Sequence, residues 1–277
     1  MMKKNYLWTK SKARLLFINS NGKANYNWIF IPGGPGLGSE YLNNLTSLLN
    51  LPGTVWHFDF PSDGSNIVVD NQEQFTNWSD ALIEAVCSLN NVILVTHSFS
   101  GMLALSTPKL ENLLDGLILM DSSPDKSWQK YFQQYVSTHP IEDAEVKLKI
   151  YYKNFSNNAL KDFVISGAPY CVCPKGLKQY ISIAKNLPFN YKSYEWYDKH
   201  FHPTYKAKWA PKKIPTLIFS GDNDHITPLE LFEKIKKFRN KNIVIAGVKN
   251  AGHYPWIENP RQVAALFKKY CSRLKIR

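Results

Sequence analysis

Cysteine is scarce in this chain, and long hydrophobic runs are missing. The 277 residues include four cysteines, and Cys171 and Cys173 lack the paired spacing of a zinc site. We expect neither a disulfide framework nor a metal. No apolar run approaches the roughly 20 residues of a membrane-spanning helix. The basic first 20 residues lead into no apolar segment, which argues against a secretory signal. These absences predict a cytoplasmic protein without a transmembrane segment.

Acidic residues are also few, since 22 Asp and Glu face 34 Lys and Arg, for a net charge of +12. Basic residues are scattered, with denser runs at 3–14, 206–213, 234–241 and 268–277. This pattern favours a solvated basic surface, and a weak attraction to anionic surfaces is the second interpretation. The sequence contains no nucleic-acid-binding motif, phosphate-binding glycine loop or dinucleotide fingerprint. We therefore expect neither a nucleic-acid partner nor a cofactor.

The sequence does contain alternating strand-like and helix-like segments, which predict a mostly parallel α/β sheet with helices on both faces. The expected strands are 28–31, 54–59, 92–96, 117–120, 216–220 and 242–246. The expected helices are 40–49, 75–89, a segment from residue 99, 229–239 and 260–274. Cys87 lies in the second of these helices and is expected in the core.

The alternation stops in the middle of the chain. From about residue 128 to 205 no segment looks like a buried parallel strand, and helical stretches rich in Tyr, Phe and Lys are broken by prolines. We interpret residues 124–212 as a helical insertion. The core then consists of residues 1–123 and 213–277. The length suits one large domain with such an insertion.

Three short fragments follow apolar runs and carry candidate chemistry: residues 95–101, 221–224 and 252–255. In chain order they supply a serine, an acid and a histidine. In parallel sheets, reactive residues gather beyond the carboxyl ends of the strands. The order Ser, Asp, His on an alternating chain favours a serine hydrolase.

Ser98 is the candidate nucleophile because it lies between an expected strand and an expected helix. The usual Gly-x-Ser-x-Gly pattern is relaxed here, with Thr96 and Ser100 at the glycine positions. The alternative is that Ser98 only caps the helix. Unpaired N–H groups at a helix start attract developing negative charge, so Phe99 is the first candidate oxyanion donor. The glycine loop 33–36 supplies the second, which we assign to Gly34 because Pro35 has no N–H.

The acid and the base come from the last two fragments. Gly221, Asp224 and Pro228 fit a Gly-x-x-Asp loop followed four residues later by proline, which favours Asp224 over its neighbour Asp222. Asp121, after another expected strand, is a third candidate. His253 is the candidate base. The other histidines have weaker claims, and His200 with His202 lacks a third ligand for a metal.

These motifs resemble the α/β-hydrolase superfamily along nearly the whole chain. The loop 32–36, Pro-Gly-Gly-Pro-Gly, is similar to the glycine loop of its proline-iminopeptidase-like branch, although Pro32 stands where relatives have His. The segments 59–65 and 252–260 are similar to two further family loops, and the second is the most specific match. The resemblance implies Ser98 as nucleophile, Asp224 as acid, His253 as base, no cofactor, and a helical cap at 124–212.

The sequence thus predicts a serine hydrolase that cleaves a small ester, thioester or amide through an acyl-enzyme. Its substrate is a small molecule, expected to carry an apolar part. A non-catalytic binding or signalling protein on the same fold remains an alternative, motivated by the relaxed pattern around Ser98. A hydrolase-fold lyase or carbon–carbon bond hydrolase is another.

Overall fold

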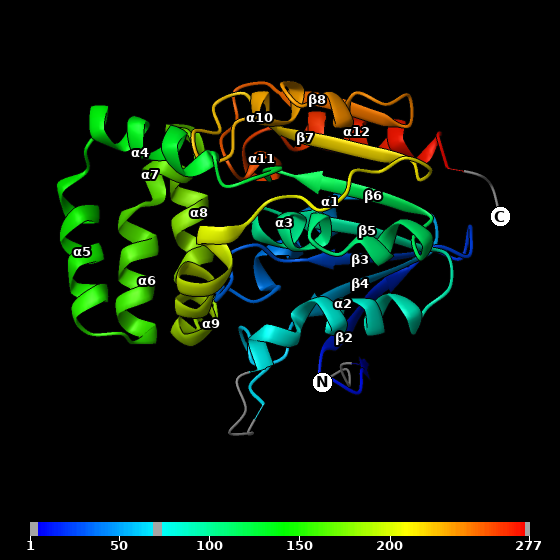
Figure 1. Cartoon of the computed structure of the whole chain (residues 1–277), viewed down its shortest axis with the longest axis horizontal. Helices are drawn as coiled ribbons and strands as arrows, with labels where there is room; N and C mark the ends of the chain where they lie inside the picture. The colour runs from blue at the N-terminus through cyan, green and yellow to red at the C-terminus, as the bar shows by residue number, and fades with distance from the viewer. Residues whose placement is uncertain (1–4, 69–73, 275–277) are drawn as a thin grey trace.

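The computed structural model describes residues 5–68 and 74–274, and its centre is one eight-stranded sheet (Figure 1). Within the described residues the strand order is β1-β2-β4-β3-β5-β6-β7-β8. The strands are β1 (Tyr6–Trp8), β2 (Arg14–Ser20), β3 (Asn27–Ile31), β4 (Thr54–Asp59), β5 (Val92–His97), β6 (Gly116–Met120), β7 (Thr216–Gly221) and β8 (Ile243–Val248).

The six strands from β3 to β8 pair in parallel, which confirms the predicted mostly parallel sheet. All six expected strands are present, and no end differs from the expected one by more than two residues. Strands β1 and β2 were not predicted. They pair antiparallel with each other, and β2 pairs antiparallel with β4. β1 is the edge strand and β2 lies next to it, and nearly all of their side chains are exposed or half-buried, so they lack the continuous apolar run of a buried strand.

Helices cover both faces of the sheet, as predicted. One face packs against α2 and α3, and the other against α1 and α12, because successive side chains of a strand point to opposite faces. The helical elements outside the stretch between β6 and β7 are η1 (Glu40–Leu42), α1 (Asn43–Leu48), η2 (Gln74–Asn77), α2 (Trp78–Cys87), α3 (Phe99–Leu105), η3 (Pro108–Asn112), α10 (Glu230–Glu233), η7 (Lys236–Phe238), α11 (Pro255–Glu258) and α12 (Pro260–Cys271).

Two expectations about the helices are wrong. The single helix expected at 229–239 is two short elements, α10 and η7, because Ile235 between them has an extended backbone. Cys87 was expected in the core but is exposed, since it is the last residue of α2.

Every named element between β6 and β7 is helical, which agrees with the helical character expected for this part of the sequence. Figure 1 shows these elements as a layer beyond one end of the sheet. They are α4 (Trp128–Thr138), α5 (Glu142–Lys153), α6 (Asn157–Ser166), α7 (Ala168–Cys171), η4 (Pro174–Gly176), α8 (Leu177–Ala184), α9 (Tyr191–Trp196), the π-helix η5 (Tyr197–Phe201) and η6 (His202–Thr204).

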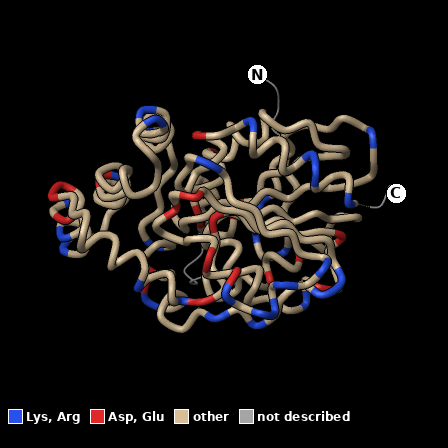
Figure 2. Tube along the Cα trace, turned by 90° about the horizontal axis from the view of Figure 1, so that it is seen from above, with Lys and Arg blue, Asp and Glu red and all other residues tan. Residues whose placement is uncertain are grey.

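This layer contacts the loops at the carboxyl ends of the strands. The Asn190 N–H donates to the Gly36 carbonyl at 2.9 Å, which joins the layer to the glycine loop after β3. Lys and Arg lie in several separate groups along the tube rather than on one element (Figure 2). None of the described helices combines the length and the apolar character needed to cross a membrane.

Candidate active site

Ser98 lies at a sharp turn between β5 and α3. Its backbone has φ 54° and ψ −119°, and residues other than glycine rarely adopt such a positive φ. The Ser98 N–H donates to the Met120 carbonyl of β6 at 2.9 Å, and the Ser122 hydroxyl donates to the Ser98 carbonyl at 2.9 Å. These bonds hold the turn, so the strained conformation projects the Ser98 hydroxyl beyond the end of the sheet.

The turn is tightly packed, and glycines allow the close approach. A side chain at Gly33 would meet Ser98 Cβ and the His97 carbonyl, both 2.7 Å from the added carbon. A side chain at Gly101 would meet the Ser122 hydroxyl at 2.5 Å. Gly101, three residues after Ser98, therefore lets α3 approach the loop after β6.

Thr96 and Ser100, at the usual glycine positions, are both fully buried and hydrogen-bonded. The Thr96 hydroxyl donates to the Ile118 carbonyl at 3.1 Å. The Ser100 hydroxyl accepts the His97 N–H at 3.0 Å and lies 3.1 Å from the Ile31 carbonyl. Their hydroxyls find backbone partners, so the turn tolerates both substitutions.

The fragment that contains His253 meets the turn at Ser98. His253 Nε2 lies 3.0 Å from Ser98 Oγ, and His253 Nδ1 lies 2.9 Å from Asp224 Oδ2. Both distances are within hydrogen-bond range. Residues separated by 155 and 29 positions along the chain thus form one hydrogen-bonded series. The Ser98 side chain remains partly accessible, whereas those of Asp224 and His253 are buried.

Asp224 is held ionised by its surroundings. Its Oδ1 accepts the N–H groups of Ile226 and Thr227 at 2.9 and 3.1 Å, and its Oδ2 accepts the Thr227 hydroxyl at 2.8 Å. Burial alone would raise the pKa of Asp224. The neighbouring His253 and the hydrogen bonds from Thr227 outweigh burial and lower that pKa below its usual value. The carboxylate is therefore the stable form beside the imidazole.

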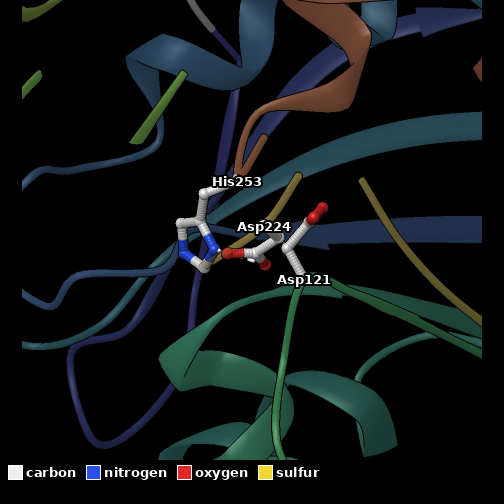
Figure 3. A group of neighbouring side chains, drawn as sticks. All are labelled: Asp121, Asp224 and His253. Atoms are coloured by element: carbon white, nitrogen blue, oxygen red, sulfur yellow. Dashed lines mark hydrogen bonds and ion pairs between the residues drawn. The ribbon is translucent and has the colours of Figure 1, made fainter. Parts of the chain in front are cut away.

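The two other candidate acids are not the hydrogen-bond partner of His253 Nδ1. Asp222 is exposed, and its Oδ1 accepts the Asn223 side-chain amide at 3.1 Å and the Ala251 N–H at 3.3 Å. Asp121 is fully buried near Asp224 (Figure 3). Its Oδ1 accepts the Gly221 N–H at 3.0 Å, while its Oδ2 has no hydrogen-bond partner. Burial, and then the charge of Asp224, raise the pKa of Asp121 well above its usual value, so it is neutral.

Among the described residues, Asp121, Asp224 and His253 form the one group whose donor atoms lie close enough to hold a metal, within 4.8 Å of one another. The group does not suit an ion well. The Nδ1–Oδ2 hydrogen bond already joins His253 and Asp224, so neither of these two atoms is free. Metal ligands must be deprotonated and free to coordinate. The chemistry of these side chains fits proton movement better.

Two backbone N–H groups near Ser98 have no acceptor among the described residues. One belongs to Phe99, the first residue of α3, and the other to Gly34, whose φ is 108°. The packing of Gly33 against Ser98 brings the glycine loop to the turn. Unpaired N–H groups beside a partly accessible hydroxyl can receive an oxygen that gains negative charge.

Glu258 supports the histidine loop, residues 249–254, and sequence reasoning did not find it. Its two carboxylate oxygens accept the N–H groups of Gly252 at 2.6 Å and Cys173 at 2.8 Å. The His253 N–H donates to the Cys171 carbonyl at 2.7 Å. The only signal was the position of Glu258 inside the segment 252–260, because the partner at Cys173 lies 85 residues away.

Comparison with known proteins places the chain in a family. The model of the alpha/beta hydrolase family matches residues 28–266. This chain belongs to the alpha/beta hydrolase family. The match confirms the resemblance seen in the sequence and the prediction of a hydrolase.

Individual relatives are distant. The chain is 25% identical over 276 residues to the pimeloyl-[acyl-carrier protein] methyl ester esterase of Wigglesworthia glossinidia brevipalpis, covering 91% of this chain and 96% of that protein. A proline iminopeptidase-related protein from Thermus thermophilus has a TM-score of 0.72 at 18% identity, covering 98% of each chain. A thermophilic esterase from Thermogutta terrifontis has a TM-score of 0.70 at 16% identity, covering 98% of each. The two structural likenesses establish the fold.

Proposed function

We propose that this chain is a serine hydrolase in which Ser98 attacks a carbonyl carbon and forms an acyl-enzyme. The observation that carries the proposal is the series Ser98 Oγ–His253 Nε2 at 3.0 Å and His253 Nδ1–Asp224 Oδ2 at 2.9 Å. An ionised Asp224 accepts a hydrogen bond from the Nδ1–H of His253, which leaves Nε2 without a proton and able to accept that of Ser98. A serine hydroxyl needs such a base to react at neutral pH.

The proposed reaction has two halves. His253 takes the proton from Ser98 as the hydroxyl oxygen bonds to the carbonyl carbon, and then gives it to the leaving group. The N–H groups of Gly34 and Phe99 stabilise the oxyanion, and each such donor typically lowers the barrier by about 3–4 kcal/mol. In the second half His253 takes a proton from water, whose oxygen bonds to the acyl carbon. The bond between that carbon and Ser98 Oγ then breaks, His253 returns the proton to Ser98, and the acid leaves.

We propose that residues 124–212 act as a cap over this site, with residues 1–123 and 213–277 as the core. Support comes from the contacts of the helical layer with the histidine loop and the glycine loop. The rings of Tyr197 and Phe201 lie 5.1 Å from that of Phe99, the residue after Ser98. Aromatic surroundings beside the nucleophile favour a substrate with an apolar part.

Among ester, thioester and amide substrates we favour a carboxylic ester. The relative from Wigglesworthia is named for a methyl ester, and the Thermogutta structure is that of an esterase. A panel of aryl and methyl esters of increasing chain length, with acyl thioesters and aminoacyl arylamides alongside, ranks the three classes by kcat/KM. A higher kcat/KM for the arylamides than for every ester would overturn this preference.

The experiment that tests the function is active-site labelling. A fluorophosphonate probe should label the wild-type protein at Ser98, as mapped by mass spectrometry. Ser98→Ala should lose labelling and about 10⁶-fold in turnover. Ser47→Ala removes an exposed hydroxyl on α1 and is the matched control, with unchanged labelling and turnover. Near-normal turnover in Ser98→Ala would contradict the role of Ser98 as nucleophile. No labelling of well-folded wild-type protein would contradict the proposal and favour a non-catalytic binder.

A further inference from the structure

The residue before Ser98 joins two loops that lie far apart in the sequence. His97 is 1% exposed, and both of its ring nitrogens have partners. Its Nδ1 lies 2.8 Å from the Tyr41 hydroxyl, and its Nε2 lies 2.9 Å from the His253 carbonyl oxygen. The Tyr41 hydroxyl also accepts the Gly33 N–H. Three hydrogen bonds in series therefore connect the glycine loop, the residue before Ser98 and the histidine loop.

The chemistry of the partners fixes the direction of each bond. The Gly33 N–H can only donate, and the His253 carbonyl can only accept. His97 Nε2 must therefore carry a proton, and in a neutral ring Nδ1 is then an acceptor for the Tyr41 O–H. Burial, and then the proximity of His253, lower the pKa of His97 well below its usual value, so the ring is neutral. One arrangement of protons satisfies every group.

Aromatic packing immobilises the same ring. The rings of Tyr254 and Trp256, which flank Pro255 after His253, each have their centroids 4.9 Å from that of His97. The Tyr41 ring stacks on Trp256 at 6.2 Å and lies edge-on to His97 at 5.6 Å. Movement of either loop relative to Ser98 would break a buried hydrogen bond and disturb this packing.

We propose that Tyr41 and His97 are positioning residues that hold the glycine loop and the histidine loop at fixed places relative to Ser98. The inference rests on the proposed function, because it assigns the two loops an oxyanion donor at Gly34 and a base at His253. Neither Tyr41 nor His97 touches the reacting atoms through its side chain. They affect the attack of Ser98 on the carbonyl carbon, which requires both loops to be aligned. Misplacement of a reacting group by about 1 Å can lower the rate of such a step about 100-fold.

Tyr41→Phe is the sharpest test, because it removes one oxygen and keeps the ring. It leaves the Gly33 N–H and His97 Nδ1 without a partner. We expect kcat to fall about 10- to 100-fold, with KM changed by less than about threefold, because alignment matters most in the transition state. The assay is steady-state kinetics on the best ester of the panel, with the thermal midpoint measured in parallel.

Tyr270→Phe is the matched control. Its hydroxyl is also buried and donates to the Pro215 carbonyl at 2.9 Å, just before β7 and therefore at the opposite end of the strands from Ser98. This variant loses a comparable buried hydrogen bond, but we expect its kcat to stay within about threefold of wild type. An equal fall in kcat for the two variants would overturn the inference.

His97→Gln tests the other half of the series and decides the matter if Tyr41→Phe does not fold. The glutamine amide can still reach the His253 carbonyl, but the ring and its acceptor for Tyr41 are lost. We expect a similar fall in kcat, and the double variant should lose no more than the worse single one, because both break one series. If the loss in kcat of the double variant equals the product of the two single losses, the proposal of one connected series is contradicted. Wild-type protein that neither takes the fluorophosphonate nor turns over any ester refutes the proposed function instead.

Discussion

Asp63 carries a buried carboxyl group beside the glycine loop, and we expect its contribution to the free energy of unfolding to fall as pH rises. Asp63 is 1% exposed, in the loop after β4. Its Oδ1 accepts the Gly36 N–H at 2.8 Å and the Ser193 hydroxyl of α9 at 2.7 Å. Burial raises the pKa of Asp63 from its usual 3.8 to about 6, because the charged form loses its hydration and these two bonds do not replace it fully.

The direction of the effect follows from the proton count. Between about pH 4 and 6 the unfolded chain has lost the Asp63 proton while the folded protein keeps it, so the free energy of unfolding falls as pH rises. The shift of about two pKa units corresponds to about 3 kcal/mol, lost in full at pH 8, while at pH 5 the loss is about half as large. Asp63→Asn removes this dependence, since an amide does not ionise.

The assay is urea unfolding followed by tryptophan fluorescence at pH 5 and pH 8. The free energy of unfolding of Asp63→Asn minus that of wild type should be about 1.4 kcal/mol larger at pH 8 than at pH 5, which means that the variant gains relative stability at high pH. The amide oxygen can still accept from Gly36 and Ser193, and any fixed cost of the amide cancels in this difference.

Asp162→Asn, at an exposed position of α6, is the control and should show no such difference. An equal effect of Asp63→Asn at both pH values, or a larger loss of stability at pH 8, would refute the reasoning. Either result would mean that the folded protein holds Asp63 ionised through its bonds to Gly36 and Ser193.

Two further predictions concern the groups around His253. Asp224→Asn should lower kcat about 10⁴-fold, because an amide cannot hold the imidazole in the tautomer that accepts the Ser98 proton. The control Asp222→Asn should keep kcat within about threefold of wild type. Both are measured by steady-state kinetics on the same ester, and equal losses would mean that Asp224 is not the acid. Glu258→Gln should lower the free energy of unfolding by about 1–3 kcal/mol, because the Gly252 or Cys173 N–H loses its carboxylate acceptor. The measurement is urea unfolding at pH 8, and an unchanged midpoint would contradict the prediction.

The parallel part of the sheet could be predicted because its strands are apolar along their length. Strand β5 is buried at every position, so its residues form a continuous run that the sequence displays. Strands β1 and β2, at the end of the sheet, were missed because nearly all of their side chains are exposed or half-buried and they carry no such run. The split of the helix expected at 229–239 was missed because the extended backbone of Ile235 leaves no mark in the spacing of apolar residues.

The candidate site was predictable as far as its residues lie in short motifs. Ser98, Asp224 and His253 each follow a strand, and the structure joins their side chains by hydrogen bonds. Both Asp224 and Asp121 follow a strand, and in the structure both are buried beside His253, so distance alone does not separate them. The difference lies in hydrogen bonding. Asp224 receives donors from Ile226 and Thr227, whereas Asp121 keeps one oxygen unpartnered and holds its proton.

The supporting residues lay beyond sequence reasoning for a physical reason. Tyr41 and His97 are 56 residues apart, and His97 meets the His253 carbonyl across 156 residues, so no local pattern links them. The turn at Ser98 nevertheless depends on such contacts. At the two glycine positions of the usual Gly-x-Ser-x-Gly pattern, Thr96 and Ser100 are buried and bond to backbone carbonyls, which ties the turn to β6 and β3. Because the turn itself is fixed, the geometry of the site depends on how accurately the glycine loop and the histidine loop are placed relative to Ser98. His97 is connected to both loops by hydrogen bonds, to the glycine loop through Tyr41.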